Sequence, residues 1–213
     1  LELLKYKKLR EGFDHRETSI VPGRDPFWHH AAARGQLGRI LLHHGDAEGA
    51  VTELAVSLSA LPEHAVAHHN MGLALAALRR YEEALRALRE AVRLKPEGVK
   101  ARAALAFLLA HTGSYVEAAE AYRRAIALSP PPHYDLDLEL AWLLATSPDG
   151  AVRNGGEAVR LAEDVCRALD WRSVRALDAL AAALAEQGDY GDASIRLEQA
   201  LALAAEKAPH GGP

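Results

Sequence analysis

Two nearly identical apolar hexamers, "LAFLLA" at residues 105–110 and "LAWLLA" at residues 140–145, lie 35 positions apart in this sequence. A third stretch, "NMGLALA" at 70–76, aligns with "ALAFLLA" at 104–110 at a spacing of 34. Self-similarity at a fixed period predicts that one supersecondary unit is repeated along the chain. The abundance of Ala, Leu and Arg favours helices in that unit.

Tyr and Pro follow the same period outside these hexamers. Tyr81 and Tyr115 each open a Tyr-x-Glu-Ala tetrapeptide, and the sequence places three prolines at intervals of 34, at Pro62, Pro96 and Pro130. A period of 34 with small residues, Tyr and Pro at fixed offsets resembles the tetratricopeptide repeat, which is a helix–turn–helix unit.

The resemblance implies an all-α fold in which antiparallel helix pairs stack into a right-handed superhelical α-solenoid. We expect this solenoid at residues 31–207, as repeats at 31–64, 65–98, 99–132, 134–173 and 174–207. The fourth repeat departs from the pattern because "SPDGAVRNGG" (147–156) replaces a short turn. The repeat with this insertion is similar to a variant seen in many bacterial repeat proteins. Residues 1–30 are expected to form an extension, with a short amphipathic helix before an irregular segment, and residues 208–213 a flexible tail.

The recurring residues have separate structural roles. Small residues at repeat positions 8 and 20 are expected to let the two helices approach closely; they are Gly38, Gly72, Ala106, Ala141 and Ala181, and Ala50, Ala84, Ala118, Ala158 and Ala193. Gly45, Gly113 and Gly188 are expected in the turn between the helices. The three prolines are expected to end the second helix, because proline cannot donate the helical hydrogen bond. Asp25 and Pro26 resemble the cap and the first position of the first helix.

The resemblance also implies where a partner would bind. In this family, positions 2, 5, 9, 12 and 13 of the first helix usually face a concave groove. The candidate groove residues at such positions are Arg39, His43, His69, Leu73, Lys100, Phe107, His111, Asp135, Leu138, Trp142, Arg175, Asp178 and Glu186. Position 9 is commonly polar in the family, but here it is Leu73, Phe107 and Trp142 in successive repeats. Such an apolar stripe predicts a binding surface for a protein segment with apolar anchors.

Basic residues flank this stripe and would favour an acidic partner; they are Arg39, Lys100 and Arg175. Two other arrangements remain open, since residues 1–30 could fill the groove and the inserted turn could cover Trp142. A clamp for a C-terminal carboxylate, known in some members of the family, would use the positions of Gly35, Arg39, Asn70, Lys100 and Ala104. Only the Asn and the Lys match the clamp, so this mode is disfavoured.

Composition excludes several classes of function. The net charge is -4 without a block of like charge, which argues against nucleic-acid binding and against a polybasic membrane surface. Every apolar run falls short of the roughly 18 residues of a membrane span. With Cys166 as the single cysteine, the chain has no internal disulfide and no thiolate metal cage. This composition fits the cytoplasm or the periplasm, for a protein that is soluble or peripheral to a complex. Because the sequence begins at Leu1, we expect a processed product or part of a longer polypeptide.

Residues with a possible role in chemistry have simpler structural interpretations. His64 and His68 have the i,i+4 spacing of metal ligands, but a third ligand is not evident beside them. "YDLDLE" (134–139) is best interpreted as a helix start, where acidic residues are favourable. The nucleotide-binding, hydrolase and metalloprotease motifs are missing from the sequence. We therefore expect a non-catalytic protein that needs neither a metal nor another cofactor.

The sequence thus predicts a scaffold that binds a segment of a partner protein in its groove. One alternative is an accessory domain or subunit of a larger enzyme or cytochrome assembly. The other is a structural subunit that self-assembles through its last helix, whose apolar residues lack a polar capping helix after them; they are Ile195, Leu197, Leu201 and Leu203.

Overall fold

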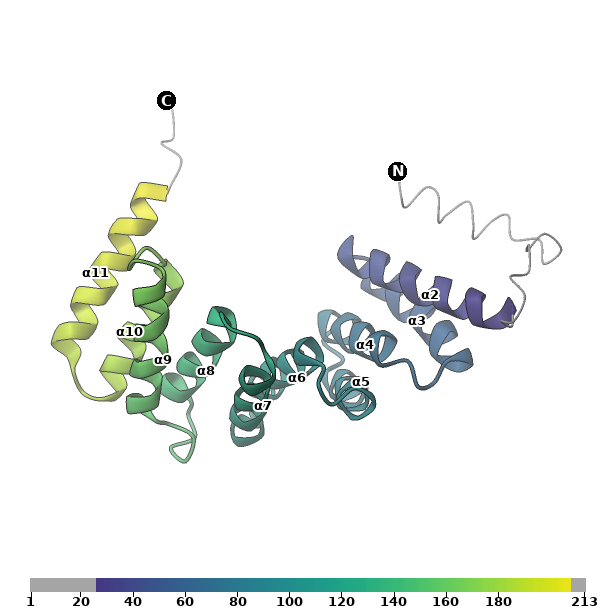
Figure 1. The fold of residues 1–213 in the computed structure, drawn as a ribbon, viewed down its shortest axis with the longest axis horizontal. Helices are drawn as coiled ribbons and strands as arrows, with labels where there is room; N and C mark the ends of the chain where they lie inside the picture. The colour runs from purple at the N-terminus through teal and green to yellow at the C-terminus, as the bar shows by residue number, and fades with distance from the viewer. Residues whose placement is uncertain (1–25, 208–213) are drawn as a thin grey trace, which may run out of the picture. The chain divides into compact units, whose positions relative to one another are not determined.

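The computed structural model describes residues 26–207, and all regular structure within them is α-helical (Figure 1). The predictions for an amphipathic helix before residue 26 and for a tail at 208–213 lie outside the described residues. The described part belongs to two compact units that divide between Ala104 and Leu105. The all-α fold that the repeat pattern predicts is confirmed.

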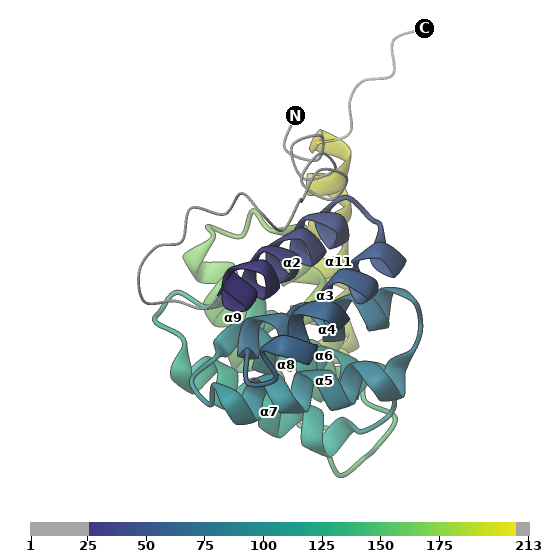
Figure 2. The ribbon, with the colours of Figure 1, turned by 90° about the vertical axis from the view of Figure 1, so that its right-hand side faces the viewer.

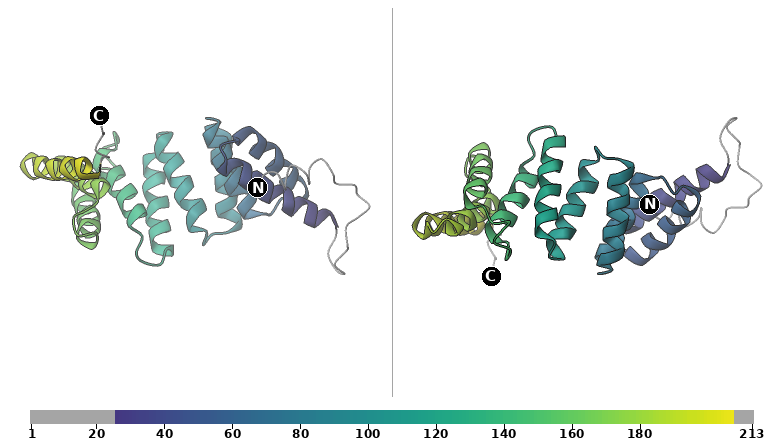
Figure 3. Two further views of the ribbon diagram at one scale, coloured as in Figure 1. Left: turned by 90° about the horizontal axis from the view of Figure 1, so that it is seen from above. Right: turned by 90° about the horizontal axis from the view of Figure 1, so that it is seen from below.

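The described part of the first unit contains four complete helices, which are α2 (Pro26–His43), α3 (Ala47–Ala60), α4 (Ala65–Ala77) and α5 (Tyr81–Leu94). In it, α2 packs on α3, α3 on α4 and α4 on α5 (Figure 2). The division falls within α6 (Val99–His111). The second unit continues with α7 (Tyr115–Leu128), α8 (Tyr134–Thr146), α9 (Gly155–Ala168), α10 (Val174–Glu186) and α11 (Tyr190–Lys207). There, α8 packs on α7, α9 and α10, and α10 also packs on α9 and α11 (Figure 3).

Glycine allows the helices of each pair in the first unit to approach closely. A Cβ atom at Gly38 of α2 would lie 2.6 Å from Leu54 Cγ of α3. A Cβ atom at Gly72 of α4 would lie 2.5 Å from Leu88 Cγ of α5. Both leucines are fully buried, and each leucine side chain occupies the space that a Cβ atom of the glycine would otherwise take. This confirms the role assigned to these two small residues.

The turns between paired helices share one hydrogen-bonding pattern. Ser114 N–H donates to the Leu109 carbonyl five residues earlier at 2.8 Å, and Asp189 N–H donates to the Leu184 carbonyl at 3.0 Å. Gly113 and Gly188, just before these donors, have φ of +89° and +83°. This is the Schellman closure of a helix, which needs a left-handed residue and is best made by glycine. At the same place between α4 and α5 the chain has Arg79, with φ of +59°.

Prolines follow the second helix of three pairs, as expected. The helices α3, α5 and α7 end at Ala60, Leu94 and Leu128, two residues before Pro62, Pro96 and Pro130. Proline restricts the residue before it and lacks an N–H, so each second helix ends before it.

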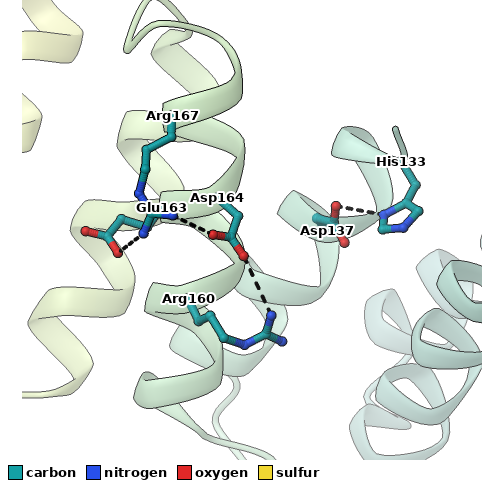
Figure 4. A network of polar contacts seen from close by, with 6 residues as sticks. All are labelled: His133, Asp137, Arg160, Glu163, Asp164 and Arg167. Carbon is teal, nitrogen blue, oxygen red and sulfur yellow. Dashed lines mark hydrogen bonds and ion pairs between the residues drawn. The ribbon is translucent and has the colours of Figure 1, made fainter. Parts of the chain in front are cut away.

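The beginning of α8 confirms the helix-start interpretation of residues 134–139. The helix begins at Tyr134, with Asp135 and Asp137 in its first turn. His133 Nδ1 lies 2.8 Å from Asp137 Oδ2 (Figure 4). The acidic residues therefore stabilise the positive end of this helix.

The inserted segment forms a short ordered turn between α8 and α9. Ser147 is buried and its Oγ accepts from Asp149 N–H at 3.2 Å. Val152 is buried as well, and Asn154 N–H donates to the Leu144 carbonyl at 2.9 Å. The side chain of Asn154 then caps α9 by accepting from Glu157 N–H at 3.1 Å. The insertion is thus anchored at both ends to the helices that it joins.

Charged residues on α9 compensate one another along its exposed face. Arg167 lies 2.7 Å from Glu163 and 2.8 Å from Asp164, while Arg160 lies 3.7 Å from Asp164 (Figure 4). Pairs at this helical spacing stabilise a helix by about 0.2–0.5 kcal/mol each. Such pairs are typical of a helix face that is exposed to solvent.

Candidate functional site

The predicted groove residues of the first unit are largely at its surface. Arg39, His43 and Lys100 are exposed, His69 is half-buried and Leu73 is 36% exposed. The pKa of His69 is lowered by burial and by the nearby charge of Lys100. These residues offer a mixed basic and apolar surface. Asn70, one of the two matches to the carboxylate clamp, is buried and is not offered to a ligand.

The predicted groove residues of the second unit divide into exposed and buried ones. Phe107 is 59% exposed and Trp142 is 45% exposed. The exposed polar ones are His111, Asp135, Arg175, Asp178 and Glu186. Leu138 is only 4% exposed, so its prediction as a groove residue is corrected. Because α8 packs on three other helices, an apolar side chain at that position joins the core.

The two hexamers share one pattern of buried and exposed residues, which explains why their sequences resemble each other. Leu108 and Leu109 of α6 are buried, as are Leu143 and Leu144 of α8. The aromatic residue just before each leucine pair is exposed. The leucines therefore explain the folding of these helices, whereas the exposed aromatic rings do not contribute to the core.

Phe107 and Trp142 line one pocket of about 220 Å³ in the second unit. Its walls come from α6, α7, α8 and the inserted turn, through residues that include Phe107, Tyr115, Tyr122, Glu139, Trp142 and Pro148. The inserted turn contributes a wall and leaves Trp142 accessible. Pockets for drug-sized ligands measure about 300–1,000 Å³, so this one is suited to a single side chain.

A carboxylate gives the pocket its polar wall. Glu139 of α8 accepts a hydrogen bond from Arg175 of α10, and its other oxygen accepts from the Tyr122 hydroxyl at 3.5 Å. Tyr122 is buried, and burial followed by the charge of Glu139 raises the pKa of its hydroxyl well above the usual range. Tyr122 is therefore a neutral hydrogen-bond donor at physiological pH.

Arg175 also pairs with Asp135 at 2.9 Å. Its guanidinium is therefore shared between two carboxylates, and these three side chains together carry a net charge of about -1. Arg175 was predicted to contribute positive charge for an acidic partner, but in the folded unit its charge is offset by two carboxylates of α8. The pairs are partly exposed, so each contributes at most about 1 kcal/mol to stability.

Most pocket residues were not among the predicted groove residues; they are Ala110, Tyr115, Tyr122, Glu139, Leu143, Thr146, Ser147 and Pro148. The groove positions of the family are defined on the first helix of each repeat, whereas Tyr115 lies on a second helix and Pro148 in a turn. Asp135 and Glu139 are four residues apart on one helix, and this spacing could have predicted that both carboxylates bind the same cationic side chain.

The described residues give little sign of other chemistry. Cys166 is buried, as expected, and burial raises the pKa of its thiol to about 11. From Pro26 to Lys207, His, Cys, Asp and Glu side chains form no group of three or more that could hold a metal ion. Over the same stretch, every helix is too short or too polar to cross a lipid bilayer.

Residues 69–131 match the tetratricopeptide repeat family model. No curated protein matches the sequence. The match includes all of α6 and α7, and therefore the Phe107 side of the pocket.

Solved structures of tetratricopeptide-repeat proteins have a similar fold. MamA residues 41 to the end from Desulfovibrio magneticus RS-1 is 18% identical, with a TM-score of 0.70, covering 84% of this chain and 97% of that one. YrrB, described as a TPR protein with an unusual peptide-binding site, is 18% identical, with a TM-score of 0.70 and coverage of 83% and 88%. A Podosopora anserina putative kinesin light chain with nearly identical TPR-like repeats is 20% identical, with a TM-score of 0.70 and coverage of 87% and 100%. At these identities the similarity concerns the fold.

Proposed function

We propose that this chain, which contains tetratricopeptide repeats, is a non-catalytic scaffold and binds a segment of a partner protein. The Phe107–Trp142 pocket is the place where an anchor side chain of that segment docks. The observation that carries this proposal is the exposure of two large aromatic rings on one pocket, beside leucines that already form the core. Exposed apolar surface of this kind usually marks an interaction site.

The fold supports the general class of function. Proteins of this repeat family are typically scaffolds that hold protein or peptide partners, and one structural neighbour, YrrB, is described by its peptide-binding site. The predicted groove residues of the first unit, taken by themselves, are a separate candidate surface for a protein segment; they are Arg39, His43, His69, Leu73 and Lys100.

The contribution of the aromatic rings can be estimated. Full burial of a large apolar side chain stabilises a complex by roughly 1.5–3 kcal/mol. Both rings are already about half covered, so the pair together would contribute about that amount. This corresponds to roughly a tenfold to hundredfold change in the dissociation constant.

The proposal is tested by selecting peptides from a random phage-displayed library on the intact protein. The Trp142 indole N–H signal, assigned by its loss in Trp142→Phe, reports whether a selected peptide reaches the pocket. We expect selected peptides to shift this signal and to lose binding to Phe107→Ala/Trp142→Ala. If selected peptides bind while the signal stays in place and the double variant retains them, the pocket is not the site.

Self-assembly through α11 is a second candidate, and a row of exposed residues favours it. They follow one another at alternating spacings of four and three, namely Tyr190, Ser194, Leu197, Leu201 and Ala204. This is the spacing of a helix–helix seam, and its small residues permit close approach. A second copy of the chain would bury this row.

A further inference from the structure

We propose that the side chain accepted by the Phe107–Trp142 pocket is an arginine of the partner segment. Its apolar stem would lie against the aromatic rings and its guanidinium would contact the carboxylates of Glu139 and Asp135. This inference rests on the proposed function and specifies its partner more closely.

The first argument is the charge at the pocket. Glu139 and His111 are the acidic and basic side chains that line it, whereas Lys and Arg are missing from its described wall. Arg175 binds the carboxylates of Asp135 and Glu139, so these three side chains together have a net charge of about -1. A cationic side chain is therefore attracted to this site, and an acidic one is repelled.

The second argument is the hydrogen-bonding capacity that remains. A carboxylate has two oxygens and about four acceptor positions. From the residues that the structure describes, Asp135 and Glu139 receive two hydrogen bonds from Arg175 and one long hydrogen bond from Tyr122. The Asp135 side chain is 92% exposed and that of Glu139 is 36% exposed. Both can accept further hydrogen bonds from a guanidinium, which presents five donors in a fixed fork.

The third argument is the aromatic wall. Arginine stacks on aromatic faces through a cation–π contact that is stronger where water is excluded. The same unit already contains one such contact, in which the Arg196 guanidinium lies 4.7 Å from the centroid of a Trp171 ring. Trp142 and Phe107 can make this contact with a partner in the same way.

Other anchors fit the site less well. A leucine would cover the rings but would remove water from Glu139 without offering a hydrogen bond, which is unfavourable. A glutamate would place a third carboxylate beside Asp135 and Glu139. The glutamate would also lack a donor in Tyr122, because that side chain is buried and its hydroxyl already donates to Glu139.

The experiment uses four synthetic peptides on the intact protein. The peptides are acetyl-Gly-Ser-Leu-X-Leu-Ser-Gly-amide, in which X is arginine, citrulline, leucine or glutamate. Citrulline has nearly the shape of arginine without its charge. Binding is followed by titrating the assigned Trp142 indole signal up to about 5 mM peptide, a range that detects weak complexes.

We expect the arginine peptide to bind about fivefold more tightly than the citrulline peptide, and the glutamate peptide to bind most weakly. Glu139→Gln should remove most of the arginine preference and leave citrulline binding unchanged. Asp135→Asn, at a side chain that is 92% exposed, should reduce the preference and lower the free energy of unfolding by at most about 1 kcal/mol. Glu198→Gln, an exposed carboxylate on α11, is the matched control and should change nothing.

The outcomes separate this inference from the proposed function. If the arginine, citrulline and leucine peptides bind equally, or if the glutamate peptide binds best, the arginine inference fails while the pocket remains a docking site. If none of the four peptides shifts the indole signal, the inference is overturned; peptides selected from the random library then decide separately whether the pocket is a docking site.

Discussion

Arg175 on α10 is held 2.9 Å from Asp135 on α8, forty positions earlier in the chain. This pair joins the first helices of two successive helix pairs, and the same guanidinium also contacts Glu139, which lines the Phe107–Trp142 pocket. It changes the expected partner, because the arginine that was predicted to attract acidic groups is neutralised by the protein's own carboxylates.

Replacing Arg175 by methionine keeps an apolar stem and removes the charge. The free energy of unfolding should fall by less than about 1 kcal/mol, because the two ion pairs are exposed. The arginine peptide should bind about two- to fivefold more tightly, since both carboxylates become available. Urea unfolding and the indole titration measure the two effects. Weaker binding of the arginine peptide would mean that Arg175 itself contacts the ligand.

The exposed aromatic residues should be dispensable for folding. Phe107→Ala/Trp142→Ala should lower the free energy of unfolding far less than the single change Leu144→Ala, which should cost about 2–5 kcal/mol at a fully buried site. Chemical denaturation followed by circular dichroism tests this. A loss for the double variant as large as that for Leu144→Ala would identify the rings as structural.

A glycine in the turn at Arg79 should increase the stability of the protein. Its φ of +59° is unfavourable for a side chain, whereas the equivalent turns have glycine. We expect Arg79→Gly to raise the free energy of unfolding by about 1 kcal/mol. Gly113→Ala, at φ of +89°, should lower it by a similar amount. Thermal and urea midpoints of the two variants should therefore move in opposite directions, and a shift of both in one direction would refute the argument.

Close helix packing should make Gly72 intolerant of a methyl group. Because the new Cβ would lie 2.5 Å from Leu88 Cγ, Gly72→Ala should cost about 1–3 kcal/mol in the free energy of unfolding. Gly156→Ala is a suitable control, since its Cβ would meet its nearest neighbour at 3.5 Å. Equal stability of the two variants in urea would show that α4 and α5 can move apart at little cost.

The second candidate function predicts an oligomer that depends on α11. Leu197→Glu/Leu201→Glu should shift the mass measured by light scattering toward that of a monomer, because charge is introduced into the proposed seam. The exposed Leu128 of α7 provides a control, as Leu128→Glu should leave the mass unchanged. A monomeric wild-type chain at high concentration would exclude self-assembly through this helix.

The sequence was sufficient for most of the fold because its signals are local. The spacing of the prolines, the turn glycines and the leucine pairs fixes where helices begin and end and which residues are buried. Gly72 and Leu88 illustrate this, since each has the size that its place in the helix pair requires.

The site was less predictable because it depends on contacts between distant residues. The repeat pattern indicated the exposed positions of Phe107 and Trp142, but it placed Leu138 with them, although packing of α8 on three helices buries that residue. The charge of the site depends on side chains of α8 and α10 that meet only in the folded unit. A position in a repeat does not specify such a pair.

The most direct test of the account is the dissociation constant of one library-selected peptide for three forms of the protein. Calorimetry would compare the wild-type chain, Phe107→Ala/Trp142→Ala, and Leu128→Ala, which removes a similarly exposed apolar side chain outside the pocket. We predict that the double variant binds about tenfold to hundredfold more weakly and that Leu128→Ala binds like the wild type. Equal affinity for all three forms would contradict the assignment of the Phe107–Trp142 pocket as the docking site.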